Sequence, residues 1–211
     1  MIDELLNNFL EVMTNFNSLS ALLGIFLLII FFLHSRKIKF TTEMLASISL
    51  ILALTVLLHF FSLYRFPQGG QITLGSEIPL ILLAWRYGVG VGFFAGFIYG
   101  FLNIIQDPFI VQPIQVLFDY PLPCMCLGLA GIFPQKIFLS TTMAFFAKFL
   151  CHFISGVVFF GSFAPEGVSP IMYSLTANLM FIVPELLICC VILKFLPVEK
   201  ILSAIDSKNK A

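Results

Sequence analysis

The sequence predicts an all-α protein, a polytopic bundle of membrane helices. Of the 211 residues, 60% are hydrophobic and only 10% are charged, whereas a soluble domain has about a quarter charged residues and less than half apolar ones. Long apolar stretches also recur along the chain, and a helix needs about 20 mainly apolar residues to cross a bilayer. The formal net charge is zero, which gives no indication of a nucleic-acid-binding surface.

Seven stretches are apolar enough to be predicted membrane spans. They cover residues 18–33, 42–63, 72–85, 89–105, 113–132, 138–163 and 171–196. The third is short, and the fifth is interrupted by Asp119, Pro121 and Pro123. The connectors between spans are rich in Gly, Pro and Gln and are too short to hold another domain. The chain is therefore expected to have an N-terminal extension with an extra helix (1–40), a six-helix membrane domain (41–200) and a cytoplasmic tail (201–211).

Basic residues near span ends predict the orientation, because Lys and Arg favour the cytoplasmic side. Among the opposite loops only Arg65 is basic, and the N-terminus, Asp107 and Glu166 there are acidic. The C-terminus is thus expected in the cytoplasm and the N-terminus outside. An acidic rather than basic start also argues against a cleaved signal peptide. The basic residues that share the cytoplasmic side are Arg36, Lys37, Lys39, Arg86, Lys136, Lys194, Lys200, Lys208 and Lys210.

Four ionisable residues stand out inside predicted spans, where a charge costs about 2.5 to 3.5 kcal/mol on insertion scales and usually faces a partner or cavity. They are Asp119, Lys148, His152 and Glu185. Lys148 and Glu185 lie at nearly the same depth, so an ion pair is possible, either in a pocket or as a purely structural pair. His152, on the same helix face as Lys148, approaches the level of Asp119 and Asn178. Three helices are therefore expected to line one polar pocket in the outer half of the membrane.

Other polar and aromatic residues have simpler interpretations. His59, near a span end, is expected to be an interfacial side chain rather than a ligand. Tyr173 alone is also compatible with an aromatic belt. The cysteines fall in apolar runs without the spacing of a zinc site, so they are expected to be reduced packing residues. They are Cys124, Cys126, Cys151, Cys189 and Cys190.

The chemistry of the predicted pocket is recognition rather than catalysis. A carboxylate among aromatic rings suits a flat organic cation, and Asn178 can donate to and accept from a heteroaromatic ring edge. Ser155, three residues from His152, does not lie in a G-x-S-x-G motif of the kind that surrounds a nucleophilic serine. The sequence also has no metal-ligand triad and no phosphate-binding loop. No cofactor or metal is expected, and any ATP hydrolysis must come from another chain.

Several motifs follow one another along the chain. They are PQGG at 67–70, YGVG at 87–90, GFIYG at 96–100, PIQVLFDYP at 113–121, HFISG at 152–156 and YSL at 173–175. In this order they resemble the thiamine-specific substrate-binding subunit of energy-coupling factor (ECF) transporters, the ThiT/YuaJ family. The resemblance covers about residues 42–196. It implies a six-helix subunit that binds thiamine near the outer surface of the bacterial cell membrane. It also implies that the subunit acts together with a transmembrane coupling protein and two cytoplasmic ATPases.

The resemblance also implies the substrate-binding residues. They are Asp119, Tyr120, Lys148, His152, Gly156, Phe160, Tyr173 and Asn178. Some members have Glu and Trp where this chain has Asp119 and Phe160, so the contacts of these two positions are expected to differ. The extra N-terminal helix has no counterpart among the family's six. In such subunits the face that meets the coupling protein usually has small residues spaced by four on the first family span. Ser49 and Ala53, with Ala46 nearby, fit this pattern, which is also common in other packed membrane helices.

The sequence leaves alternatives open for one loop, for the ligand and for the class of protein. Segment 66–76, with Pro67, Gly69, Gly70 and Gly75, is expected to be either a lid over the pocket or an ordinary exposed turn. The ligand could instead be another flat vitamin or a thiamine precursor such as its pyrimidine fragment. An intramembrane enzyme or a structural membrane protein is the alternative from another class.

Overall fold

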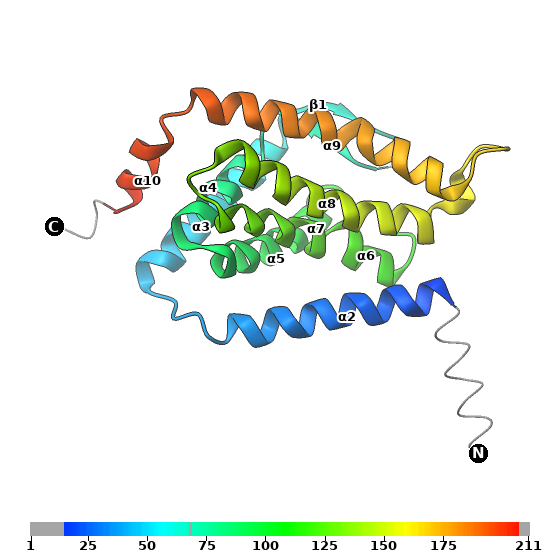
Figure 1. Cartoon of the computed structure of the whole chain (residues 1–211), viewed down its shortest axis with the longest axis horizontal. Coiled ribbons are helices and arrows are strands. Elements are labelled where there is room, and N and C mark those ends of the chain that lie inside the picture. Colours follow the sequence, from blue (N-terminus) through cyan, green and yellow to red (C-terminus); the bar gives the residue numbers. More distant parts are fainter. Residues whose placement is uncertain (1–14, 68, 207–211) are drawn as a thin grey trace, which may run out of the picture.

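The computed structural model describes residues 15–67 and 69–206 of the chain. The acidic start of the chain, Gln68, Lys208 and Lys210 lie outside the described residues. Helices dominate, and most run along the long axis of the molecule (Figure 1). In order, the elements are α2 (Phe16–Ser35), α3 (Thr42–His59), β1 (Ser62–Arg65), β2 (Gln71–Thr73), α4 (Ile78–Tyr87), α5 (Val89–Gln106), α6 (Pro113–Asp119), α7 (Pro121–Cys126), η1 (Leu127–Ile132), α8 (Ile137–Phe159), η2 (Gly161–Phe163), α9 (Pro170–Phe195) and α10 (Val198–Asp206).

The all-α membrane bundle predicted from the sequence is confirmed. Among the described residues, six segments are long and apolar enough to cross a membrane, namely α2, α3, α5, the α6–η1 segment, α8 and α9. Large apolar side chains cover the outside of the bundle, as expected of surfaces that face lipid; Leu50, Ile105 and Phe195 are each more than 70% exposed. The chain is therefore a multi-pass membrane protein.

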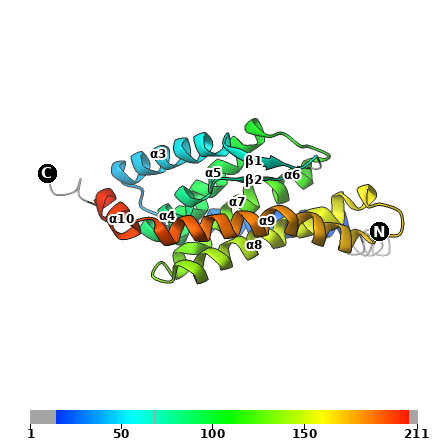
Figure 2. The same cartoon turned by 90° about the horizontal axis from the view of Figure 1, so that it is seen from above.

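The third predicted span is wrong as a continuous membrane helix. Residues 72 and 73 belong to strand β2, and the helix that follows, α4, has only ten residues. β2 pairs antiparallel with β1, so a short hairpin and a short helix replace the span. Figure 2 shows this hairpin beside α9, with which β2 is in contact. A backbone without lipid contact can leave the helical form inside a membrane protein, and all of α4 up to Trp85 is buried.

The fifth predicted span is a chain of short pieces rather than one helix. α6 ends at Asp119, and Tyr120 has the non-helical backbone angles φ −123° and ψ −78° before Pro121 opens α7. A 3-10 helix, η1, then completes the segment. Proline removes a backbone donor and clashes with the preceding turn, so a helix tends to end before it. The break places Asp119 and Tyr120 at a helix end in the interior of the bundle.

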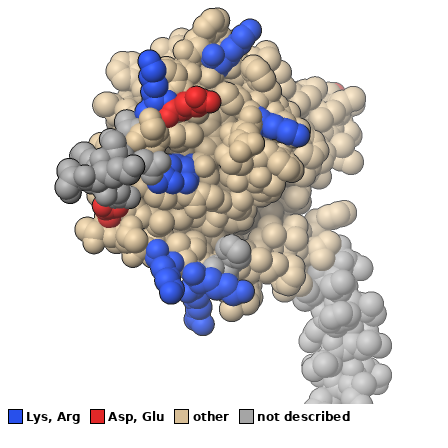
Figure 3. Space-filling model, turned by 60° about the vertical axis from the view of Figure 1, so that its left-hand side comes forward, with Lys and Arg blue, Asp and Glu red and all other residues tan. Residues whose placement is uncertain are grey.

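Basic side chains gather at the end of the molecule where α10 lies. The connection from α2 to α3, the end of α4, the start of α8 and the end of α9 all meet there (Figure 1). Figure 3, with this end turned forward, shows several Lys and Arg side chains on that face. The N-terminal end of α2 lies at the opposite end of the bundle (Figure 1).

Candidate functional site

A cavity of about 370 Å³ opens between the hairpin, α5, α6, α8 and α9. It lies toward the ends of α5 and α8 and the start of α9, away from the basic end of the molecule. Small-molecule sites commonly have volumes of about 300 to 1,000 Å³. All eight residues predicted to bind the substrate line this cavity, namely Asp119, Tyr120, Lys148, His152, Gly156, Phe160, Tyr173 and Asn178. The binding role of each remains a prediction.

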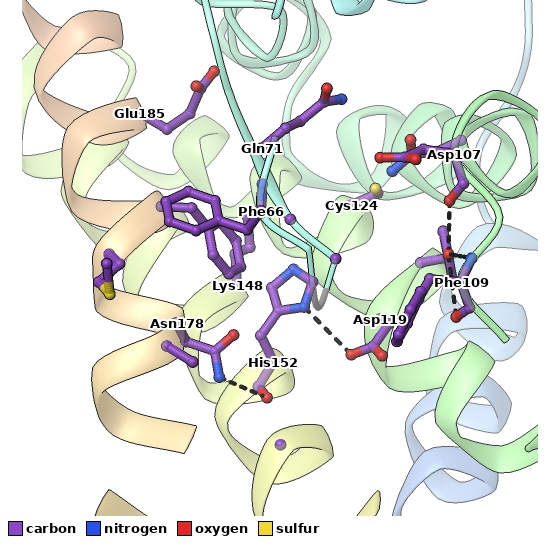
Figure 4. Close-up of a pocket in the computed structure, with 18 of the residues that line it drawn as sticks. Phe66, Gln71, Asp107, Phe109, Asp119, Cys124, Lys148, His152, Asn178 and Glu185 are labelled. Atoms are coloured by element: carbon purple, nitrogen blue, oxygen red, sulfur yellow. Dashed lines mark hydrogen bonds and ion pairs between the residues drawn. The ribbon is translucent and has the colours of Figure 1, made fainter. Parts of the chain in front are cut away.

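Asp119, at the end of α6, faces His152 on α8 across the cavity (Figure 4). The Nδ1 atom of His152 lies 3.4 Å from one carboxylate oxygen of Asp119. The other oxygen accepts a hydrogen bond from the side-chain amide of Gln115, one turn earlier on α6. Gln115 is fully buried and also donates to the carbonyl oxygen of Phe109 at 3.1 Å. The carboxylate is therefore held in place from its own helix while one edge faces the cavity.

Asn178 lines the cavity and also connects α9 to α8 through hydrogen bonds. Its side-chain nitrogen donates to the carbonyl oxygen of His152 at 3.2 Å and to that of Ser174 at 2.8 Å. Among the described residues, its side-chain oxygen has no hydrogen-bond donor, so that oxygen can accept from a ligand.

Gly156 lines the same wall and allows the two helices to approach closely. A Cβ atom at position 156 would lie only 2.2 Å from the hydroxyl oxygen of Ser174. The absence of a side chain therefore sets the distance between α8 and α9 and, with it, one dimension of the cavity.

Aromatic rings form another wall. The rings of Phe109 and Phe160 are stacked, with centroids 5.8 Å apart and an angle of 19° between their planes. The hydroxyl of Tyr120 donates to the carbonyl oxygen of Asp107 at 2.8 Å and accepts from the amide of Phe109 at 2.6 Å. Tyr120 thus holds the connection between α5 and α6, on which Phe109 stands. Its hydroxyl is already bonded within the protein, which favours a positioning role over direct ligand contact.

The ion pair predicted between Lys148 and Glu185 is wrong. The ammonium group of Lys148 pairs instead with the carboxylate of Glu77, at the start of α4, and both side chains are nearly fully buried. Glu185 accepts hydrogen bonds of 2.5 Å from both the amide and the hydroxyl of Thr73 on β2. Equal depth on two helices suggested the wrong partner because the hairpin and the start of α4 insert between them and supply nearer ones.

The interfacial position predicted for His59 is also wrong. His59 is only 7% exposed and lies at the cavity, where Nδ1 is 3.0 Å from the hydroxyl of Tyr99. The side-chain nitrogen of Gln71 on β2 also hydrogen-bonds the ring of His59. The end of α3 is covered by the hairpin, so this histidine faces protein rather than the membrane surface.

Acidic groups outnumber basic ones around the cavity. Among the described residues, four carboxyl groups line it, from Glu77, Asp107, Asp119 and Glu185, against one ammonium group, that of Lys148. Arg65 lies 3.9 Å from Asp107 at the rim, where both side chains are substantially exposed. In a site with little water, such a balance attracts a cation. Within the described ranges, no three His, Cys, Asp or Glu side chains are grouped as metal ligands.

Several lining residues escaped the sequence analysis. Glu77 comes from the segment read as the start of a span, and Phe181 comes from the lipid-like run of α9. Gln71 and Thr73 belong to segment 66–76, which was expected over the pocket without any residue of it being singled out for its polar side chain. One signal was available for Glu77, which is a lone charge directly before a long apolar run. Phe181 carried no such signal, because nothing in sequence distinguishes it from the phenylalanines that face lipid. Phe181 forms an edge contact with His152, with ring centroids 5.6 Å apart.

Comparison with known proteins agrees with the arrangement of the helices. A solved structure from Listeria monocytogenes, described as native-SAD phasing for ThiT, superposes with a TM-score of 0.67 at 21% identity and covers 74% of this chain and 93% of that one. At this identity the likeness supports the fold.

Sequence relatives and a family match identify the family. A thiamine transporter ThiT of Bacillus subtilis is 34% identical over 168 residues, which cover 71% of this chain and 87% of that protein. Another from Lacticaseibacillus paracasei is 32% identical over 121 residues, covering 48% of this chain and 60% of that protein. Residues 45–204 match the family described as Thiamine transporter protein (Thia_YuaJ), so this chain belongs to that family, which is one of transporters and not of enzymes.

Proposed function

We propose that this chain captures thiamine in the cavity between the hairpin and helices α5, α6, α8 and α9. The observation that carries the proposal is the composition of that cavity, in which an excess of carboxyl groups and stacked aromatic rings surround a space of about 370 Å³. Thiamine has a permanently cationic thiazolium ring and a flat aminopyrimidine ring. Cation attraction and ring stacking both strengthen when water is excluded.

The polar groups of the cavity match the edge of the aminopyrimidine. The carboxylate of Asp119 can accept from its amino group, while the side-chain oxygen of Asn178 can accept and His152 can donate or accept. Phe109, Phe160 and Tyr173 offer ring faces. This assignment gives five of the eight predicted residues a chemical task, namely Asp119, His152, Phe160, Tyr173 and Asn178.

The proposed orientation follows from the basic end of the molecule. Lys and Arg gather at the end that holds α10, and such residues favour the cytoplasmic side of a bacterial membrane. The cavity then opens toward the outside, the C-terminus lies in the cytoplasm and the N-terminus lies outside. This orientation suits the capture of a vitamin from the medium.

We further propose that import needs partners. The sequence has no phosphate-binding loop of the G-x-x-x-x-G-K-[ST] kind, so energy from ATP must be supplied by other chains. The family resemblance suggests an ECF transmembrane coupling protein and two cytoplasmic ATPases. The exposed small residues Ser49 and Ala53 on α3 are available for helix contact.

A binding titration of the purified chain tests the proposed function. Thiamine, thiamine phosphates and the isolated aminopyrimidine fragment are titrated by calorimetry in the same detergent. Tight binding of thiamine supports the proposal, and preference for the fragment would favour a precursor transporter. Mass spectrometry of the recovered ligand completes the test, because conversion to a product would indicate an enzyme instead.

A further inference from the structure

The N-terminal helix α2 lies outside the matched family region, which begins at residue 45. It packs against α5, α6 and α8, on the side of the bundle away from the hairpin (Figure 1). Most of its side chains face outward and are exposed. One stripe turns inward at helical spacing and consists of Ser20, Gly24, Leu28 and Phe31.

The inward stripe contacts the back of α6. A Cβ atom on Gly24 would lie 3.2 Å from Cε2 of Phe118 and 3.7 Å from a methyl group of Leu117. Phe118 is 1% exposed and Phe31 is 4% exposed, and both belong to one cluster of buried side chains with residues of α7 and α8. Phe31 also contacts Phe97 of α5, with ring centroids 5.2 Å apart. α2 is therefore joined to the core by ordered aromatic contacts.

Phe118 directly precedes Asp119, the carboxylate that faces the cavity. Adjacent residues on a helix point about 100° apart, so Phe118 can rest against α2 while Asp119 points inward. α6 has only seven residues and is followed by a break at Tyr120. A helix this short is not stable alone, so its position depends on what packs against it.

From these contacts we infer that α2 positions Asp119 for ligand binding. Gly24 packs against the back of α6 at Phe118, and α6 carries the carboxylate on its other side. Gly24 is thus a positioning residue, since it acts on the ligand only through its neighbours. The inference takes thiamine as the ligand from the proposed function. The contact between α2 and α6 is a feature of the structure and does not depend on that function.

A double-mutant cycle tests this inference in the full-length protein. Gly24→Leu adds side-chain atoms against the ring of Phe118, which already lies 3.2 Å from the Cβ position, so we expect α6 to shift. Thiamine affinity is expected to fall about tenfold, the loss expected when one charge-assisted hydrogen bond is weakened. In an Asp119→Asn background the same substitution should cause no further loss. Parental affinity in Gly24→Leu, or additive losses in the double variant, would overturn the inference.

The neighbouring position offers a matched control. Ile25 is 50% exposed and faces away from the bundle, so Ile25→Trp adds bulk to α2 on the lipid side. Its thiamine affinity should stay within about twofold of the parent. An equal loss in Ile25→Trp would assign the effect to α2 in general and overturn a specific role of Gly24. If Gly24→Leu does not fold, Gly24→Ala serves instead, with a smaller loss in the same direction.

Hydrogen exchange measured by mass spectrometry gives a second result that needs no ligand. Backbone amides of residues 113–120 should exchange faster in Gly24→Leu than in the parent or in Ile25→Trp. Unchanged exchange there would overturn the inference even if thiamine binds. Failure of the parent to bind thiamine would instead overturn the proposed function and leave the exchange result to decide the role of α2.

Discussion

Replacing Asp119 with asparagine separates charge from shape in the cavity. The side chain is 17% exposed, faces His152 and is held by Gln115 on its other oxygen. Asparagine keeps the size and the ability to hydrogen-bond but removes the negative charge. The substitution should therefore leave α6 in place and weaken thiamine binding.

The magnitude follows from the type of interaction lost. A hydrogen bond to a charged group contributes about 1.5 to 3 kcal/mol, against about 1 kcal/mol for a neutral one. Since each 1.4 kcal/mol is a factor of ten in Kd, complete loss of this contribution weakens binding about 10- to 150-fold. The neutral amide recovers part of it, so we expect a result toward the lower end of that range.

Calorimetric titration of thiamine measures the change, with the ligand-free melting temperature as a check on folding. Asp107→Asn is the matched control, because Asp107 lines the same cavity but its side chain is 38% exposed and lies beside Arg65. Exposed pairs contribute about 0 to 1 kcal/mol, so this control should weaken binding by about fivefold at most. Equal affinity in Asp119→Asn and the parent, or equal losses in the two variants, would refute the reasoning.

Three further predictions concern stability, access and transport. Lys148→Met leaves the carboxylate of Glu77 buried without its partner and should destabilise the ligand-free protein by about 3 to 5 kcal/mol. Adding Glu77→Gln should recover much of that loss; thermal unfolding in detergent measures both variants, and no recovery would contradict the pairing. Gly69 and Gly70 have φ angles of +90° and +83°, and replacing both with alanine should change the rates of thiamine association or release in stopped-flow fluorescence while the ligand-free melting temperature changes little. Unchanged rates would mean that the hairpin only connects helices. Vesicles holding only this chain should not accumulate thiamine, and uptake against a gradient without an ATPase would disprove the need for partners.

Much of the fold was predictable because membrane solvent imposes simple rules on sequence. Six of the seven predicted spans correspond to long apolar segments of the structure, since a helix that satisfies its own backbone in lipid must be apolar over a fixed length. The hairpin was not predictable in this way. Gln71 and Thr73 lie in short strands covered by protein, where the requirement for a lipid-facing helix no longer applies.

The cavity was predictable where motifs and helix depth both pointed to it, and not where a partner came from a loop. Asp119, His152 and Asn178 line one space as expected. The partner of Lys148 was missed because depth along a helix says nothing of a segment that enters between two helices. His59 was missed for the same reason, since the hairpin that buries it was not expected.

The close approach of Gly156 to Ser174 limits how thiamine can leave the cavity. With no space for even a methyl group between them, α8 and α9 are interlocked at this point, and sliding one past the other would drive Ser174 into the backbone of its neighbour. We therefore expect the wall they form to keep its spacing during a transport cycle. We expect movement instead where the hairpin meets α9, since Glu185 of α9 binds Thr73 of β2 through two hydrogen bonds that can break and re-form. Exit of the vitamin is thus expected to begin with the hairpin parting from α9, while the two interlocked helices keep their spacing.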